Sequence, residues 1–264
     1  MSAHWSPAQR FIEALKAAYG VEGAAAKVVE FCDSQDTTAL AGLMLDWRGW
    51  WARPKQLPPE GRWRSWGFLG GRGMGKTRSC VEFINHEVDA GRATRIALAA
   101  QKLDRTIGMQ VQALIDTAPP WNRPEWIDSK LRLVWPNGAY ALALTPEVPG
   151  EIRGDNYDLS WVCELQSWPT ATMEEAFDNF QLSTRVGLAR IVWDCTPKRR
   201  HPILLGLLDA AKENPEIHHV VRGTIYENAA NLAPGVIADL ERKMKDTQRG
   251  KEEPQPGLHE QVRR

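Results

Sequence analysis

The stretch LGGRGMGKTRS, at residues 69–79, decides the fold class of this 264-residue chain. Four of its residues match the pattern G-x-x-x-x-G-K-[ST]: Gly70, Gly75, Lys76 and Thr77. The apolar segment WGFLG at 66–70 comes before the pattern, and a segment with helical periodicity at 76–90 follows it. A strand before the loop and a helix after it form the context in which this pattern binds phosphate. The sequence therefore predicts a nucleotide-binding α/β domain.

Each part of the loop has an expected task. Glycines allow the backbone N–H groups to surround the β-phosphate, and Lys76 reaches the β and γ oxygens. The hydroxyl of Thr77 is a ligand for Mg²⁺, so the expected cofactors are ATP and Mg²⁺. We expect the nucleotide to lie against the whole loop: Gly70, Gly71, Arg72, Gly73, Met74, Gly75, Lys76, Thr77 and Arg78.

Composition is that of an ordinary globular protein, with 43% hydrophobic and 25% charged residues. Because 33 Lys and Arg balance 33 Asp and Glu, no global positive field favours nucleic acid, and any such contact requires a local patch. The sequence contains no apolar run of about 18 residues and no secretory signal, which favours a cytosolic protein. The four Cys are scattered, which argues against a zinc site or a disulfide framework. The twelve Trp are interpreted as core and interface anchors rather than as base-stacking residues.

The chain divides into three expected parts. A capping box at Ser6 and helical spacing of apolar residues predict a small N-terminal helical subdomain over 1–50. The proline-rich segment 52–66 interrupts helicity and opens the nucleotide-binding domain at 51–247. Residues 248–264 are polar and without apolar periodicity, so we expect a tail.

Within the central part, predicted strands alternate with predicted helices. This alternation indicates a mainly parallel sheet with helices on both faces. The turn signal Pro136-Asn137-Gly138 predicts an antiparallel hairpin within 131–144. The expected strands are 66–70, 95–100, 159–164, 189–195 and 217–228, and the expected helices are 76–90, 101–117, 172–184, 203–213 and one opened by Pro234.

Glu164 ends the apolar segment LSWVCE and is the candidate catalytic residue. Hydrolysis requires a carboxylate that orients water at the carboxyl end of a strand near the loop. Its distance from the loop in the sequence favours the RecA-like (ASCE) class of P-loop NTPases, in which another strand lies between the two. A helix cap or a solvated strand end is the alternative for Glu164. Cys163 occupies the position where a magnesium-binding Asp is expected, and a neutral thiol is a poor ligand for Mg²⁺. Asp158, at the other end of this strand, is a poor substitute.

The segment CTPK follows the next predicted strand. It puts Thr196 and Lys198 near the carboxyl ends of the strands, where a polar side chain can sense the γ-phosphate. The basic run Lys198-Arg199-Arg200 is a candidate for DNA contact, with a solvated surface as the alternative.

Taken together, these segments resemble the ATPase part of the large terminase subunit of tailed bacteriophages, particularly those related to gene transfer agents. The resemblance covers about 45–240. LGGRGMGKTR resembles the Walker A segment, WVCELQSW the Walker B segment and CTPK the coupling motif. PPWNRPEW, LVWPNGA, EIRGDNYD and VRGTIYENAANLAP also resemble this family.

The resemblance implies an ATP-driven motor that moves double-stranded DNA into a procapsid. It implies sequence-independent DNA contacts, a portal protein and a small terminase subunit as partners, a homo-oligomeric ring on the portal, and a location in the host cytoplasm. Arg72 and Arg153 become candidates for contact with the γ-phosphate. For Arg153 a structural ion pair is the alternative. Gln56 and Arg53 become candidates for contact with the adenine.

Two departures from the family pattern stand out. Cys163 replaces the Asp of the Walker B pair, which puts magnesium affinity and turnover in question. Family members also continue into an RNase H-like nuclease domain, and no nuclease activity is expected from the present chain. A nucleotide-binding assembly or regulatory subunit with weak or lost hydrolysis is therefore the alternative function. A helicase or clamp loader is a third hypothesis, against which the additional family segments argue.

Overall fold

The computed structural model describes residues 4–197, 201–233 and 235–245. The chain forms two compact units, Met1–Leu57 and Pro58–Arg264, that divide within the proline-rich segment. The sequence-based boundary at residue 50 lies earlier, and the expected tail at 248–264 lies outside the described residues.

The first unit is helical. Ser6 caps its first helix: its side chain accepts a hydrogen bond from the backbone of Gln9, and the Gln9 side chain accepts one from the backbone of Ser6, as the capping box predicts. Gly20 interrupts this helix at φ 72°, a conformation that glycine adopts at little cost. The elements are α1 (Pro7–Ser34), α2 (Thr37–Leu45), the π-helical turn η1 (Trp47–Trp51) and the 3₁₀ turn η2 (Pro54–Gln56).

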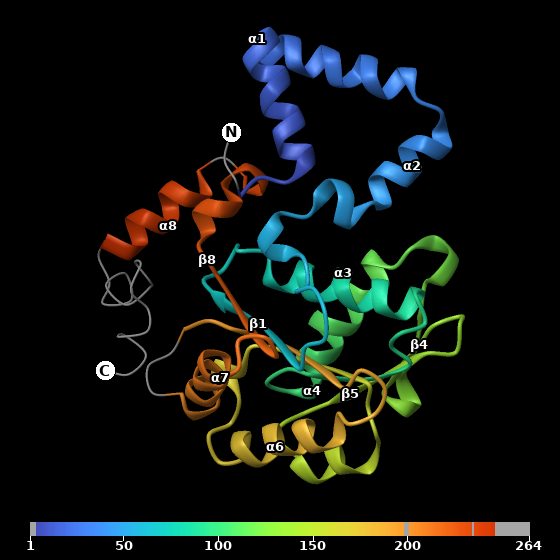
Figure 1. Ribbon diagram of the computed structural model, residues 1–264, viewed down its shortest axis with the longest axis vertical. Helices are drawn as coiled ribbons and strands as arrows, with labels where there is room; N and C mark the ends of the chain where they lie inside the picture. The colour runs from blue at the N-terminus through green and yellow to red at the C-terminus, as the bar shows by residue number, and fades with distance from the viewer. Residues whose placement is uncertain (1–3, 198–200, 234, 246–264) are drawn as a thin grey trace. The chain divides into compact units, whose positions relative to one another are not determined.

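The second unit is built on an eight-stranded sheet (Figure 1) in the order β3-β4-β5-β2-β6-β7-β1-β8. The pairs from β5 to β8 are parallel, and β4 pairs antiparallel with both β3 and β5. The predicted hairpin and the mainly parallel sheet are thus confirmed, while β3 was not predicted. The strands are β1 (Ser65–Gly70), β2 (Arg95–Ala99), β3 (Glu125–Ile127), β4 (Arg132–Val134), β5 (Tyr140–Leu144), β6 (Leu159–Val162), β7 (Arg190–Cys195) and β8 (His218–Gly223).

Helices cover both faces of the sheet, as Figure 1 shows for α3 on one face and for α6 and α7 on the other. The region predicted as one helix over 101–117 consists of three consecutive helical segments. The helices are α3 (Lys76–Asp89), α4 (Leu103–Arg105), π-helical η3 (Thr106–Val111), α5 (Gln112–Thr117), α6 (Met173–Ser183), α7 (Pro202–Glu213) and α8 (Val236–Lys245). Short 3₁₀ segments are η4 (Pro120–Asn122), η5 (Asp128–Lys130), η6 (Pro149–Gly154), η7 (Leu165–Ser167) and η8 (Ile225–Asn231).

The hydrophobic core consists of two layers, one on each face of the sheet. Trp193 occupies its layer because Gly67 on the neighbouring strand leaves room: a Cβ at Gly67 would lie 1.9 Å from the indole ring. Half of the twelve Trp are buried, which confirms a core role for these six: Trp63, Trp66, Trp135, Trp161, Trp168 and Trp193. Removal of one such side chain costs about 3–5 kcal/mol.

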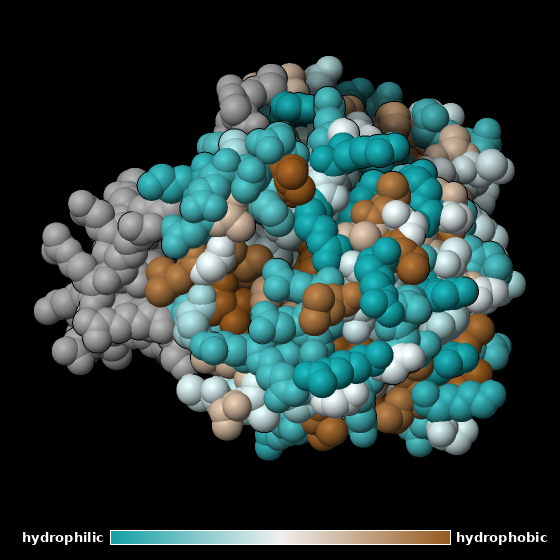
Figure 2. Space-filling model, turned by 60° about the horizontal axis from the view of Figure 1, so that its bottom comes forward, coloured by the Kyte–Doolittle hydropathy of each residue, from teal (hydrophilic) through white to brown (hydrophobic). Residues whose placement is uncertain are grey.

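The surface is mostly hydrophilic on the side that includes α6. Figure 2 shows small apolar areas on this face, separated by hydrophilic side chains. In the described part of the chain, no helix has the length and apolar character needed to cross a membrane.

Candidate functional site

The phosphate loop connects β1 to α3, and its glycines adopt conformations that other residues rarely take. Gly73 has φ 77°, and Gly75 has φ 93° where it caps the N-terminus of α3. The Lys76 Nζ donates hydrogen bonds to the carbonyl oxygens of Gly70 (2.6 Å) and Gly71 (3.0 Å). The ammonium group therefore lies inside the loop, beside the N-terminal end of a helix, where an anion is stabilised.

One side chain of the loop anchors it to the sheet. Met74 is buried against the ends of β1 and β8, where a Cβ at Gly70 would lie 2.5 Å from the Met74 sulfur. Met74 thus contributes packing, and only its backbone faces the expected phosphate. Arg72 is exposed, and the Arg78 guanidinium lies 2.5 Å from the Glu82 carboxylate one turn along α3.

The segment after β8 supports the loop from the side. Asn228, in η8, donates a side-chain hydrogen bond of 2.6 Å to the carbonyl oxygen of Gly73. The same segment brings Ile225 against Gly73, since a Cβ on that glycine would lie 3.1 Å from the isoleucine side chain. The segment is part of the terminase resemblance, but a role for Asn228 could not be predicted from the sequence. No residue near Asn228 in the sequence indicates that β8 lies beside β1.

Glu164 lies beyond the carboxyl end of β6, and β7 separates β6 from β1. This order is the one expected from the position of Glu164 in the sequence. Glu164 has φ 50° and ψ 47°, which is unusual for a residue other than glycine. Its backbone N–H donates a hydrogen bond of 3.3 Å to the Asp194 carboxylate. The sharp turn directs the chain away from the strand immediately after the candidate catalytic position.

Asp194 is a buried carboxylate at the carboxyl end of β7, and sequence analysis did not identify it. Only 2% of its surface is exposed, and it also accepts a hydrogen bond of 3.2 Å from the Trp161 indole N–H. Burial raises the pKa of Asp194, while the Lys76 ammonium and hydrogen bonds from Cys163, Trp161 and the Glu164 backbone oppose that rise. The sequence feature that could have identified Asp194 is an acidic residue between the apolar residues Trp193 and Cys195 near the end of a predicted strand.

Cys163 is a buried neutral thiol beside this carboxylate. Burial, first, and the Asp194 charge, second, raise the pKa of Cys163 well above its ordinary value. The thiol therefore keeps its proton beside the Asp194 carboxylate. A protonated thiol is a poor ligand for Mg²⁺, as the sequence indicates.

The candidate sensor is connected to the catalytic strand. The Thr196 backbone N–H donates a hydrogen bond of 2.9 Å to the side-chain oxygen of Gln166, in the 3₁₀ turn η7 that directly follows Glu164. A displacement at Thr196 would therefore act on the turn that carries Glu164. The basic run Lys198-Arg199-Arg200, a candidate for DNA contact, lies outside the described residues.

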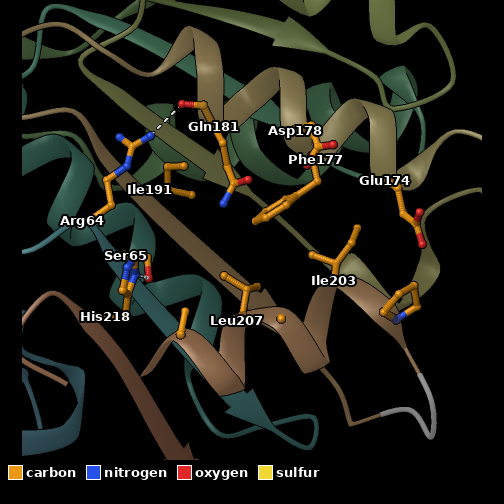
Figure 3. A pocket seen from close by; sticks show the side chains of 13 residues that line it. Arg64, Ser65, Glu174, Phe177, Asp178, Gln181, Ile191, Ile203, Leu207 and His218 are labelled. Atoms are coloured by element: carbon orange, nitrogen blue, oxygen red, sulfur yellow. Dashed lines mark hydrogen bonds between the residues drawn. The ribbon is translucent and has the colours of Figure 1, made fainter. Parts of the chain in front are cut away.

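A pocket of about 360 Å³ lies between α6 and α7, at the amino ends of β1, β7 and β8 (Figure 3). Arg64 closes one side of it by donating a hydrogen bond of 2.7 Å to the carbonyl oxygen of Gln181. Ligands of open α/β sheets bind beyond the carboxyl ends of the strands, which is the opposite end. We therefore assign the candidate site to the phosphate loop and not to this pocket.

The family of the chain follows from a comparison of sequences. The model of the family described as "Terminase large subunit, T4likevirus-type, N-terminal" matches residues 67–253, more than half of the chain. The chain belongs to this family. No curated protein matches it.

Solved structures of phage terminases have the same fold. The large terminase of a thermophilic bacteriophage matches with a TM-score of 0.55 and 13% identity, over 79% of this chain and 50% of that one. The same terminase in complex with ATP-gamma-S gives 0.55 and 15%, over 79% and 49%. A variant of the large terminase ATPase domain from Thermus phage P74-26 gives 0.51 and 15%, over 72% and 86%. The present chain thus spans about half the length of the full large terminases.

The residues that the terminase resemblance adds have mixed surroundings. Arg153, in η6, donates hydrogen bonds of 2.9 Å to Asn179 and to Glu175 of α6, and its side chain is 62% exposed. An ion pair this exposed is worth little, so it leaves Arg153 available at small cost for the predicted phosphate contact. In the first unit, the buried Gln56 side chain accepts hydrogen bonds from the backbone and side chain of Arg53. The adenine contact of these two residues stays a prediction.

The residues present fit a Mg²⁺–nucleotide complex. The described residues hold no group of three His, Cys, Asp or Glu side chains that could bind a metal ion. A metal at this site would therefore arrive with phosphate oxygens, as Mg²⁺ does in NTPases. Oxygen donors at this end of the sheet include the Thr77 hydroxyl at the start of α3 and the carboxylates of Glu164 and Asp194.

Proposed function

We propose that this terminase chain is the ATP-hydrolysing motor domain of a phage DNA-packaging machine. The observation that carries the proposal is the arrangement of two neighbouring features. Lys76 lies inside a glycine loop at the end of β1, and Glu164 lies beyond the end of β6, which β7 separates from β1. The ATP-gamma-S complex of a similar terminase supports nucleotide binding.

The proposed chemistry assigns a task to each residue. Glu164 orients and deprotonates the attacking water, while Lys76 and Arg72 or Arg153 neutralise charge that develops on the β and γ oxygens. The Thr77 hydroxyl would hold Mg²⁺, which would supply further positive charge at the phosphates. The turn at Glu164 keeps its backbone in a strained conformation, which is a common feature of catalytic positions.

Loss of phosphate would be transmitted through Thr196. Its hydrogen bond to Gln166 joins the sensor to the turn after Glu164, so hydrolysis at one strand end displaces the neighbouring one. The moving part then acts on DNA. A motor of this kind grips phosphates without regard to sequence, so its DNA affinity falls steeply with salt.

The proposed partners follow from the terminase family. They are double-stranded DNA, a portal protein, a small terminase subunit and further copies of this chain in a ring. Assembly would take place in the host cytoplasm on the procapsid portal. Either Arg72 or Arg153 would then act on the nucleotide of a neighbouring subunit.

A second candidate function is an assembly or regulatory subunit that binds ATP without efficient turnover. Cys163 favours it, because the thiol adds no negative charge to the magnesium site. This candidate predicts ATP binding at normal affinity and negligible hydrolysis.

The deciding experiment measures Mg²⁺-dependent ATP hydrolysis with and without long double-stranded DNA. Wild type should turn over and Glu164→Gln should not, although both bind ATP. Asp158→Asn is the matched control: it alters a buried carboxylate at the other end of β6 and should hydrolyse like wild type. A wild type that binds ATP but stays inactive with DNA would refute the motor and favour the second candidate.

A further inference from the structure

Asp194 has the properties of a carboxylate held ready at the nucleotide site. Its position pairs with Phe68 of β1, two residues before the phosphate loop begins at Gly70. It lies close enough to Lys76 for the ammonium charge to act on it. It therefore lies at the base of the loop, on the face of the sheet that α3 covers.

The first turn of α3 connects Asp194 to the expected magnesium ligand. The Asp194 charge acts on Cys80 of α3, as does the Lys76 charge. Residues three and four positions apart share a helix face, so Thr77 lies on the same face of α3 as Cys80. The Thr77 hydroxyl and the Asp194 carboxylate are thus on the same side of the loop.

Asp194 and Cys163 occupy equivalent positions on neighbouring strands. Val162 of β6 pairs with Trp193 of β7. Cys163 directly follows Val162, and Asp194 directly follows Trp193. The carboxylate that the Walker B pattern expects at position 163 is therefore present one strand closer to the loop. The Asp194 charge also acts on the Cys163 thiol, so the two side chains lie near each other.

The hydrogen bonds of Asp194 leave acceptor capacity. An ionised carboxylate offers about four lone-pair positions. Two donors among the described residues use this capacity: the Trp161 indole and the Glu164 backbone N–H. These donors fix the orientation of the carboxylate. A fixed orientation suits a ligand of Mg²⁺ or of its bound water, because Mg²⁺ requires nearly ideal coordination geometry.

We propose that Asp194, from β7, supplies the carboxylate that engages the Mg²⁺ of bound Mg–ATP, in place of the residue at position 163. The Trp161 indole and the Glu164 backbone N–H then orient Asp194, and Cys163 stays an uncharged neighbour. The proposal rests on the nucleotide binding proposed above. It explains how a terminase with Cys at the Walker B position retains an acidic magnesium site.

The test measures metal affinity separately from hydrolysis. Mn²⁺ serves as the probe, and its electron paramagnetic resonance signal is titrated against the full chain with ATP-gamma-S. Binding of ATP-gamma-S without metal is measured in EDTA by tryptophan fluorescence. Asp194→Asn and the smaller Asp194→Ser should bind the nucleotide in EDTA like wild type. Their Mn²⁺ affinity should fall by about tenfold or more.

Two further variants separate this role from a structural one. Asp158→Asn alters a buried carboxylate of the same sheet and should leave Mn²⁺ affinity unchanged. Cys163→Asp combined with Asp194→Asn moves the carboxylate to β6 and should restore Mn²⁺ affinity to within about threefold of wild type, well inside the tenfold loss expected above. Circular dichroism and Tm confirm that each variant folds, and Asp194→Ser replaces Asp194→Asn if the amide disrupts folding.

The outcomes are distinct. If Asp194 only supports the turn at Glu164, its variants will lower turnover but leave Mn²⁺ affinity within about twofold of wild type. A change of about twofold is smaller than the contribution of one hydrogen bond, and this outcome would show that the proposal is wrong. If wild type binds ATP-gamma-S neither in EDTA nor with Mg²⁺, the proposed function itself fails, and this inference fails with it. A metal-specific loss that the double variant reverses supports both.

Discussion

The two ends of the parallel strands use the same residue types for different purposes. At the amino ends, the buried Asp158 accepts hydrogen bonds of 2.8 Å from the backbone and hydroxyl of Thr94, and further ones from the Arg95 backbone. At the carboxyl ends, the buried Asp194 has an indole, a thiol and the nearby charge of Lys76 around it. Asp158 ties two strand ends together, whereas Asp194 lies at the base of the loop for which we propose phosphate binding.

Strain follows the same division. Glu164 at the carboxyl end of β6 and Ala189 just before β7 have almost the same positive φ, 50° and 49°. The Ala189 turn is closed by a backbone hydrogen bond to Val186 and lies at the amino end of β7, opposite to the end that carries Asp194. A positive φ thus occurs in a connecting turn at the amino end of the sheet and at the candidate catalytic position at the carboxyl end.

The largest expected effect distinguishes these two strained residues. Glycine adopts a positive φ without strain, so Glu164→Gly should fold at least as stably as wild type but lose the carboxylate. ATP turnover should fall by about 10²–10⁴-fold, the usual contribution of a general base. Steady-state hydrolysis and thermal unfolding are measured in parallel.

Ala189→Gly is the matched control for that variant. It should raise the free energy of unfolding by about 0–1 kcal/mol and leave turnover unchanged. Equal losses of turnover in both variants would mean that turn geometry, and not the Glu164 carboxylate, limits hydrolysis.

A smaller effect concerns the ion pairs at the amino ends. Burial raises the pKa of Glu87, but the Arg92 hydrogen bond and the charges of Arg190 and Arg92 together lower it below its ordinary value. The Glu87 side chain is 5% exposed and contacts Arg92 at 2.7 Å and Arg190 at 2.9 Å. Glu87→Gln should therefore lower the free energy of unfolding by about 2–3 kcal/mol at neutral pH.

The pH dependence of that difference has a definite sign. Because the folded-state pKa is depressed, the ionised Glu87 stabilises the fold above its ordinary pKa of 4.5, and this stabilisation is lost as the pH falls through the folded value. Urea unfolding of wild type and Glu87→Gln should converge as the pH falls below 4.5 and through the lower folded-state pKa of Glu87, where the carboxylate becomes protonated. A constant difference down to pH 3 would contradict the ion-pair explanation.

The sequence predicts local features well and neighbouring strands poorly. The phosphate loop, its helix and the hairpin at Pro136-Asn137-Gly138 follow from short motifs with fixed backbone requirements, and the structure has all three. Glu164 could be proposed because it ends an apolar strand. Asp194 could not be connected to Cys163 from sequence, because that contact exists only once β7 lies between β6 and β1. Partner choice among strands depends on packing over the whole sheet.

Arg153 illustrates a different limit. The sequence left a phosphate contact and an ion pair as alternatives, and the structure has the ion pair with Glu175. This pair does not decide between them, because an exposed pair of about 0–1 kcal/mol is easily exchanged for a phosphate. Where competing contacts of a side chain differ this little in free energy, residue types alone do not predict which contact it makes.

The smallest expected effect concerns the support of the loop by η8. Asn228→Ala removes the hydrogen bond to the Gly73 carbonyl, which is exposed to water that can replace it. We expect KM for ATP to rise by about threefold, less than 1 kcal/mol, with kcat unchanged, because the bond shapes the loop before the nucleotide binds. Asn231→Ala, a neighbouring residue that donates to the Asn228 side chain, should have a weaker effect in the same direction. If Asn228→Ala lowers kcat instead, the hydrogen bond from η8 contributes to stabilisation of the transition state. Hydrolysis would then depend on η8 as well as on the phosphate loop and the two carboxylates.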